Sequence, residues 1–226
     1  MADFFKKIAD INEPYLIAEI GINHNGDMNI AKKLIDASNA CEWNCVKFQK
    51  RDPNLCVPED QKQVPRETPW GMMAYIDYKH KIEFQQKEYE IIDTYCKEKP
   101  IDWTASVWDL NSLEFMMNFD VPFIKIPSAQ LTNHELVSEL AKSNKPIIIS
   151  TGMSTWDMID SVVEILENNI KVLHISSEPI FECYNQIFWP SIKTTQISKY
   201  IFAYKIIKKN SSLRFGAKKN QLKKYC

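Results

Sequence analysis

The chain has 226 residues, of which 45% are hydrophobic, 12% aromatic and 25% charged, and its formal net charge is −1. This composition excludes a disordered or fibrous protein and predicts one large α/β domain with a sizeable core. No uncharged apolar run approaches the roughly 18 residues that a membrane helix needs, and charges lie where a signal peptide would place its apolar stretch. We therefore expect a cytoplasmic protein that does not interact with membranes.

Six apolar runs of strand length alternate with helical patterns between residues 15 and 176. The runs cover residues 15–22, 45–49, 103–107, 123–126, 147–150 and 171–175. Helical spacing is seen between them, for example at Ile30, Leu34, Ala37 and Cys41. Such alternation predicts an α/β fold with parallel strands, as an open doubly wound sheet or a closed (β/α) barrel with six visible βα units.

The connection between the second and third runs, residues 50–83, is unusually long. It contains Pro53, Pro58, Pro65 and Pro69 and an aromatic stretch over 70–78. Structureless connections of this length are usually functional. The pattern predicts a loop or lid over one end of the sheet, and an irregular structural insertion is the alternative.

Polar side chains follow or end each predicted strand, and two of them are lysines inside apolar runs. In a (β/α) barrel, the carboxyl ends of the strands carry the active site. A lysine in a strand usually reaches solvent, but two ammonium groups with nearby hydroxyls can hold a phosphate and a carboxylate. A Schiff-base lysine is the other chemical alternative. The strand-end residues with this potential are Glu19, Lys47, Gln49, Ser106, Lys125, Ser128 and Ser150.

The histidines and cysteines do not predict a metal site. His24 lies in an Asn-His-Asn-Gly turn, His80 and His134 are interpreted as surface residues, and His174 as a core residue. No two histidines have the spacing of metal ligands. The six cysteines include no C-x-x-C pair, so we expect free thiols, with no disulfide and no zinc.

Five segments in order resemble motifs of the sialic acid (N-acetylneuraminate) synthase family, which includes the legionaminate and pseudaminate synthases. The segments are AEIGINHNG at 18–26, VKFQKR at 46–51, TPWG at 68–71, KIPS at 125–128 and KPIIISTGM at 145–153. Together they cover roughly residues 15–175. The resemblance implies a TIM-type (β/α)8 barrel, a homodimer and a divalent metal, manganese or magnesium. It also implies a transferase that condenses phosphoenolpyruvate with an N-acylated mannosamine-type sugar to a sialic-acid-like nonulosonate, releasing phosphate.

The resemblance also implies roles for individual residues. Glu19, Lys47 and Lys125 match catalytic positions, and Glu19 and Gln49 match positions that hold the sugar's hydroxyls. Trp108 stands where an aromatic residue lies beside the sugar, and ordinary core packing is its alternative role. The residues expected to grip phosphoenolpyruvate are Lys47, Lys125, Ser128 and Ser150, with Ser106 nearby.

The sequence changes character after residue 176. Residues 177–226 carry nine lysines and one arginine against two glutamates, a net charge of +8, which leaves −9 for the first 176 residues. The family's metal-binding histidines have no counterpart after His174, and its C-terminal antifreeze-like domain has none either. We therefore predict a phosphoenolpyruvate-binding barrel over 1–176 that is incomplete, truncated or frame-disrupted.

The basic segment 177–226 is predicted to be a divergent tail that forms part of the barrel end. Only residues 200–207 are apolar enough for a seventh strand. Its lysine pairs are scattered, so nucleic acid is not an expected partner. Two alternatives to an active synthase follow: a catalytically inactive barrel, or a Schiff-base aldolase on the same fold.

Overall fold

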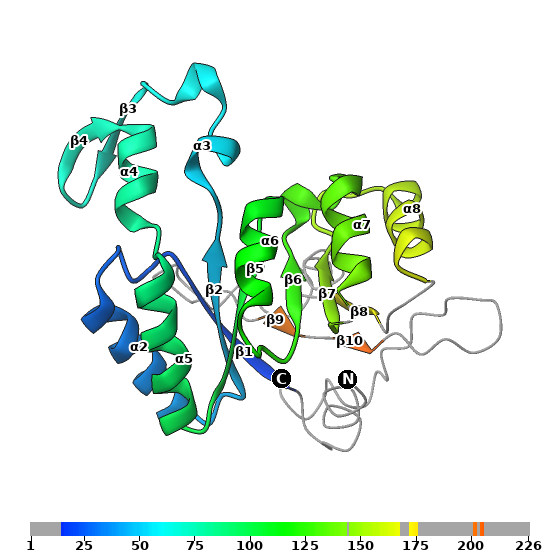
Figure 1. The fold of residues 1–226 in the computed structure, drawn as a ribbon, viewed down its shortest axis with the longest axis horizontal. Coiled ribbons are helices and arrows are strands. Elements are labelled where there is room, and N and C mark those ends of the chain that lie inside the picture. The colour runs from blue at the N-terminus through cyan, green and yellow to red at the C-terminus, as the bar shows by residue number, and fades with distance from the viewer. Residues whose placement is uncertain (1–14, 144, 168–171, 176–200, 203, 206–226) are drawn as a thin grey trace, which may run out of the picture.

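A parallel sheet of six strands forms the centre of the molecule (Figure 1). The computed structural model describes residues 15–143, 145–167, 172–175, 201–202 and 204–205. Neighbouring parallel strands follow the order β8-β7-β6-β5-β2-β1. All six predicted strands are therefore confirmed, apart from small shifts at their ends. The strands are β1 (Leu16–Gly21), β2 (Cys45–Lys50), β5 (Asp102–Val107), β6 (Ile124–Ile126), β7 (Ile147–Ser150) and β8 (Val172–Ile175).

Five helices connect these strands. They are α2 (Met28–Ala40), α5 (Gln86–Glu98), α6 (Leu110–Met117), α7 (His134–Lys142) and α8 (Trp156–Glu167). Helix α2 packs on α5, and α7 packs on both α6 and α8, so the helices form an outer layer. Helix α2 begins where the Asp27 side chain accepts a hydrogen bond from the Asn29 amide at 2.7 Å, which satisfies one free N–H of the first turn. No helix in the described ranges is both long and apolar enough to cross a membrane.

The two faces of the sheet differ because side chains alternate along each strand. Phe48, Trp103 and Ile124 belong to the apolar core beneath the helices, whereas Lys47 and Lys125 occupy alternate positions in the same strands. This arrangement is a partial barrel of the (β/α) type. The site residues therefore lie on the face of the sheet opposite to this helix-covered core.

Two very short strands lie at the two edges of the parallel sheet. Strand β9 (Ile201–Phe202) pairs antiparallel with β1, and β10 (Tyr204–Lys205) pairs antiparallel with β8. Strand structure in the predicted range 200–207 is therefore confirmed at these four residues, but it forms two short strands on different edges instead of a single seventh strand. Antiparallel pairing at both edges satisfies part of the backbone that an open sheet would expose. The rest of the predicted tail lies outside the described residues.

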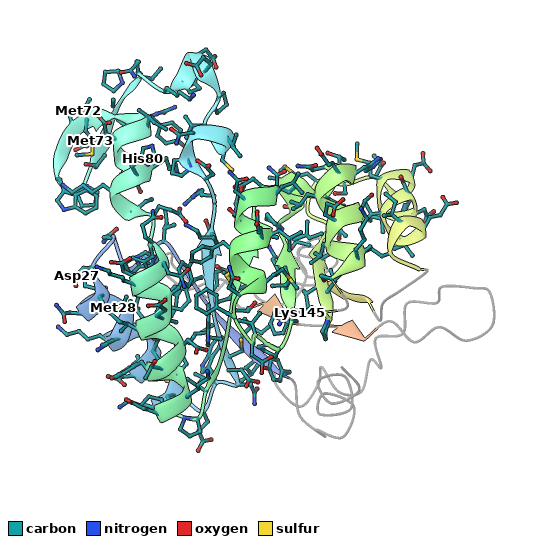
Figure 2. The ribbon with its side chains drawn as sticks, viewed as in Figure 1. Asp27, Met28, Met72, Met73, His80 and Lys145 are labelled. Carbon is teal, nitrogen blue, oxygen red and sulfur yellow. The ribbon has the colours of Figure 1, made fainter. Side chains whose placement is uncertain are left out.

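The connection 50–83 has regular structure, so the prediction of a structureless loop is wrong. It contains α3 (Pro53–Cys56), the 3-10 turn η1 (Glu59–Gln61), the antiparallel hairpin of β3 (Pro65–Thr68) and β4 (Gly71–Ala74), and α4 (Tyr75–Ile82). Figure 1 shows this insertion projecting from the end of β2. In Figure 2, Met72 and Met73 lie on the hairpin and His80 lies on α4. The structural-insertion alternative describes it better.

Substitution of Gly26 should reveal how tightly the turn after β1 packs on this insertion. Gly26 has φ +69°, and a Cβ there would lie 2.4 Å from the Lys81 carbonyl oxygen. Gly26→Ala should lower the free energy of unfolding by about 2–3 kcal/mol in urea denaturation, through backbone strain plus this clash. Gly71→Ala is the control, because Gly71 has φ +93° with no atom within 4 Å of a Cβ. Equal losses in the two variants would mean that the packing contributes nothing.

Candidate functional site

Four side chains from four neighbouring strands meet at the carboxyl end of the sheet. The Lys47 ammonium forms an ion pair with the Glu19 carboxylate and donates a hydrogen bond to the Ser106 hydroxyl at 2.8 Å. Glu19 is paired with Lys47 in the β1–β2 register, and Ser106 with Lys125 in the β5–β6 register. Residues far apart in the sequence thus form one cluster, at the end of the sheet where a (β/α) barrel carries its active site.

Among the amines of the described residues, Lys125 has the most strongly lowered pKa. Its residue is 7% exposed, and burial together with the Lys47 charge lowers its pKa to about 7, against the opposing effect of Glu19. Lys47 is 2% exposed, so neither lysine reaches solvent. Two amines face one carboxylate here, which leaves the cluster with an excess of positive charge near neutral pH. An anion that enters the site would relieve the repulsion between the lysines.

Gln49 of β2 and one carboxylate oxygen of Glu19 of β1 both lie next to Gly21. Glu19 Oε1 is buried and has no hydrogen-bond partner within the part of the chain that the structure describes. A Cβ on Gly21 would lie 3.3 Å from this oxygen and 3.4 Å from Gln49 Nε2. Gly21, with φ +55°, therefore lets the backbone pass close to both polar groups, which a side chain at this position would crowd.

The other three predicted site residues lie at the same end of the sheet without joining the cluster. Ser150 is the last residue of β7, and Ser128 follows β6 and opens the 3-10 turn η2 (Ser128–Gln130). Both are half-buried. Trp108 follows β5, and its ring lies 5.6 Å from the Arg51 guanidinium carbon. No hydrogen bond joins these three to the Lys47 cluster in the described ranges.

A second group of buried charges, which sequence reasoning did not assign, lies where β2 ends. The Arg51 Nε and backbone N–H donate to the two carboxylate oxygens of Glu83, at 3.2 and 3.0 Å. The Lys50 ammonium lies 3.5 Å from the same carboxylate. Burial raises the pKa of Glu83 in spite of both cations. The alternation Lys47, Gln49, Arg51 along one strand was a signal that Arg51 continues the polar face.

The described part of this site does not suit the divalent metal that the resemblance implies. Two of its charged groups are amines, and its one carboxylate, Glu19, is already paired with Lys47. No group of three or more histidine, cysteine, aspartate or glutamate side chains that could hold a metal occurs among the residues that the structure describes.

His24 is a buried residue of the turn after β1. Its ring stacks on Phe84 with 3.9 Å between centroids, and its Nδ1 accepts a hydrogen bond from the Gly26 amide at 3.0 Å. Burial lowers the pKa of His24 to about 4, and the Arg51 charge acts in the same direction. The imidazole is therefore neutral and structural at pH 7, as the turn interpretation predicts. His80 and His134 are exposed, as expected, and the side chain of His174 lies outside the described residues.

We predict that His24 makes the fold sensitive to acid. Between its ordinary pKa of 6.5 and about 4, the unfolded chain binds a proton that the native state does not, so stability falls as the pH falls. The expected contribution is about 3 kcal/mol over this range. His24→Asn, which can still accept from Gly26, should remove this part of the pH slope in urea denaturation. The exposed control His134→Asn should keep the full slope, and an unchanged slope in His24→Asn would contradict the prediction.

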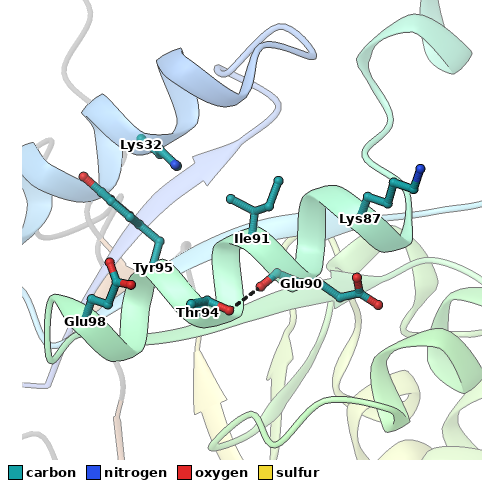
Figure 3. Close-up of a pocket in the computed structure, with 7 residues that line it drawn as sticks. All are labelled: Lys32, Lys87, Glu90, Ile91, Thr94, Tyr95 and Glu98. Atoms are coloured by element: carbon teal, nitrogen blue, oxygen red, sulfur yellow. Dashed lines mark hydrogen bonds between the residues drawn. The ribbon is translucent and has the colours of Figure 1, made fainter.

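A groove of about 470 Å³ lies elsewhere, on the outer helical layer. Figure 3 shows it lined by residues of α5 and by Lys32 of α2. Thr94 Oγ1 donates to the Glu90 carbonyl oxygen at 2.9 Å within α5. The groove contains none of the predicted site residues, so it is not the candidate site.

The fold and the site together define a partial (β/α) barrel with a cluster of two lysines, a glutamate and a serine at the carboxyl end of its strands. A model of the NeuB family matches residues 34–181 of the chain. The chain therefore belongs to the NeuB family.

Two curated proteins and one solved structure illustrate this relationship. The N-acetylneuraminate-9-phosphate synthase of Drosophila melanogaster is 38% identical over 165 residues, which are 71% of this chain and 44% of that protein. The N,N'-diacetyllegionaminic acid synthase of Campylobacter jejuni is 32% identical over 72% of this chain and 51% of its own length. The N-acetylneuraminic acid synthetase of Leptospira borgpetersenii, solved with citrate, has a TM-score of 0.64 and 26% identity. That comparison covers 74% of this chain and 55% of the other, so this chain spans about half the length of these relatives.

Proposed function

We propose that this chain provides the phosphoenolpyruvate site of a nonulosonate synthase, an enzyme that joins phosphoenolpyruvate to an N-acylated mannosamine-type sugar. Water is consumed, a carbon–carbon bond forms and inorganic phosphate leaves. Lys47 and Lys125 bind the phosphate and carboxylate of phosphoenolpyruvate, with Ser106, Ser128 and Ser150 as hydroxyl partners. Gln49 and Glu19 hold hydroxyls of the sugar, and Glu19 moves a proton. Trp108 lies beside the sugar.

The Lys47–Lys125 pair is the observation that carries this proposal. Two buried amines with one shared carboxylate are costly without a ligand, because burial penalises each charge and the two charges repel. A small dianion compensates both amines. The unpartnered oxygen Glu19 Oε1 supports the sugar's position, since it offers an acceptor beside Gln49. Family membership and the names of the relatives agree with this substrate class.

The experiment is calorimetric binding of phosphoenolpyruvate to the full chain, followed by phosphate release with N-acetylmannosamine and manganese. We expect binding by the wild type and phosphate release only when sugar is present. Lys47→Met should lose binding, whereas Lys142→Met, at an exposed residue of α7, should keep it. Absence of binding by a folded wild type would reject the proposal. Binding without release would assign the chain to the inactive-barrel alternative.

A Schiff-base aldolase is the second candidate, because a lysine with a pKa near 7 is partly neutral and nucleophilic. In that reaction the Lys125 amine would add to a keto group and lose water to form an imine. Borohydride treatment with pyruvate would then attach the reduced adduct to Lys125, which mass spectrometry of peptides detects. We expect no adduct, and an adduct on Lys125 would favour the aldolase. A homodimer remains a prediction from the family resemblance.

A further inference from the structure

We infer that the Thr104 hydroxyl positions Lys125, because it ties the start of β6 to β5 and so fixes where that lysine lies beside Lys47. This inference rests on the proposed function and deepens it, since it names the group that sets the spacing of the two phosphoenolpyruvate-binding amines. The Thr104 hydroxyl donates a hydrogen bond to the Phe123 carbonyl oxygen at 2.6 Å. Phe123 lies directly before β6, and Lys125 is the middle residue of that strand. Thr104 acts through Lys125, so it is a positioning residue and not a catalytic one.

Strand β6 has little backbone pairing on its β5 side. The β5–β6 register contains one residue pair, Ser106 with Lys125, whereas β6 and β7 pair at three positions and β2 and β5 at six. One such pair fixes a point but leaves the angle between the two strands open. The Thr104 hydrogen bond adds a second attachment, two residues before the paired position in each strand. Together the two attachments fix the direction in which β6 runs past β5.

Burial of Thr104 indicates that its hydroxyl serves this attachment. The residue is 0% exposed, and a buried hydroxyl costs free energy unless it is hydrogen-bonded. Valine has nearly the same shape and the same preference for strands, so neither packing nor strand formation requires a hydroxyl here. What threonine adds is a donor for the backbone of the neighbouring strand.

Thr104 belongs to a column of polar side chains along the site face of β5. Asp102 accepts a hydrogen bond from the Tyr15 hydroxyl at 2.5 Å, and Ser106 accepts one from Lys47 at 2.8 Å. Alternate residues of a strand share a face about 7 Å apart, so Thr104 lies one side-chain layer below Ser106. Strand β5 therefore holds the first lysine directly and, through Thr104, the strand that carries the second.

A shift of β6 would change the electrostatic environment of Lys125. Within the described ranges, the charged groups that act on its amine are Lys47 of β2 and Glu19 of β1, and its register partners on β5 and β7 are the uncharged Ser106 and Ile148. Burial and the Lys47 charge both lower the pKa of Lys125. If β6 moves away from β5, the amine gains solvent and distance from Lys47. Its pKa should then rise toward the ordinary value of 10.5.

Two measurements on the full chain test this inference. The first is an NMR titration of the Lys125 amine without ligand, in protein labelled with carbon-13 lysine and assigned by the loss of its signal in Lys125→Met. The second is calorimetric binding of phosphoenolpyruvate at pH 6, where the amine is charged, and at pH 9. Thr104→Val should raise the pKa of Lys125, weaken binding at pH 6 about fivefold, and reduce the further loss of affinity at pH 9. Thr104→Ser, which keeps the hydroxyl, should restore the wild-type values.

Ser112→Ala is the matched control. Its hydroxyl is also buried and donates to the Asp109 carboxylate at 2.8 Å, at the start of α6. Its loss should lower stability without changing the Lys125 titration or phosphoenolpyruvate binding. Thermal unfolding shows whether each variant is folded, and Thr104→Ala, which also lacks the hydroxyl, takes the place of Thr104→Val if that variant is not.

The outcomes separate this inference from the proposed function. A Thr104→Val chain that titrates and binds like the wild type would overturn the inference. The same change in Ser112→Ala, or no recovery in Thr104→Ser, would overturn it too, because the cause would then be general destabilisation or side-chain size. If the wild type does not bind phosphoenolpyruvate, the proposed function fails, and the ligand-free titration still decides whether Thr104 positions Lys125.

Discussion

Replacing Glu83 with alanine should lower the free energy of unfolding by about 3–5 kcal/mol. The variant leaves Arg51 and Lys50, each 7% exposed, without the carboxylate that both contact. It also removes the acceptor of the Arg51 backbone N–H. Breaking a buried ion pair is costly because the remaining charges stay out of water, even where the intact pair contributes little. Chemical denaturation at pH 7 measures the change.

Glu59→Ala is the matched control for this prediction. Glu59 also pairs with a lysine, Lys62, at 2.6 Å, but its side chain is 88% exposed. Removal of such a surface pair should cost less than about 1 kcal/mol. Glu83→Gln should fall between the two, since it keeps an acceptor for Arg51 and loses the charge. Equal losses of the free energy of unfolding in Glu83→Ala and Glu59→Ala would mean that the chain just after β2 does not depend on this ion pair for its stability.

Replacing Lys125 with methionine should weaken phosphoenolpyruvate binding and stabilise the fold. Loss of a charge-assisted hydrogen bond corresponds to about a tenfold to hundredfold weaker affinity. The native pKa of Lys125, about 7, lies below its ordinary 10.5, so the native state holds fewer protons between these values. Wild-type stability therefore rises with pH across this window, and the full penalty is present below pH 7. At pH 6 the variant should be more stable than wild type by roughly 1–4 kcal/mol.

Denaturation at pH 6 and pH 9 tests the stability part, and calorimetry at the same values tests binding. The wild type should bind phosphoenolpyruvate more weakly at pH 9, because the Lys125 amine is then neutral. Lys142→Met should show neither effect, since Lys142 is exposed on α7. A Lys125→Met chain that is less stable at pH 6 and binds normally would refute both the burial argument and the assigned role.

The sequence predicted the strands and most of the site because both follow from alternation within short apolar runs. Lys47 and Lys125 could be placed on one face because each lies between buried hydrophobic neighbours, and parallel strands bring their carboxyl ends together. The strand and helix order left an open sheet and a (β/α) barrel as alternatives, and the family resemblance favoured the barrel. The alternation of residues along a strand was sufficient to predict the strand and the face of each side chain wherever one face had to be apolar.

The insertion and its ion pair could not be predicted in the same way. Prolines over 53–69 suggested irregular chain, but Pro53 opens a helix and Pro65 begins a hairpin strand, positions where a missing N–H costs little. The partner of Arg51 is Glu83, 32 residues away, and only the three-dimensional path of α4 brings them together. Neither residue has a local spacing that marks the contact.

The attachment of the insertion through Glu83 has a consequence for how a ligand would enter. The Glu83 carboxylate accepts hydrogen bonds from both the side chain and the backbone N–H of Arg51, the residue after β2. The surface that Arg51 forms at the end of β2 is therefore in place before any ligand arrives. The conformational entropy of ordering that surface is lost during folding and does not oppose association. A ligand should therefore meet a preorganised surface on this side, and association should be fast there.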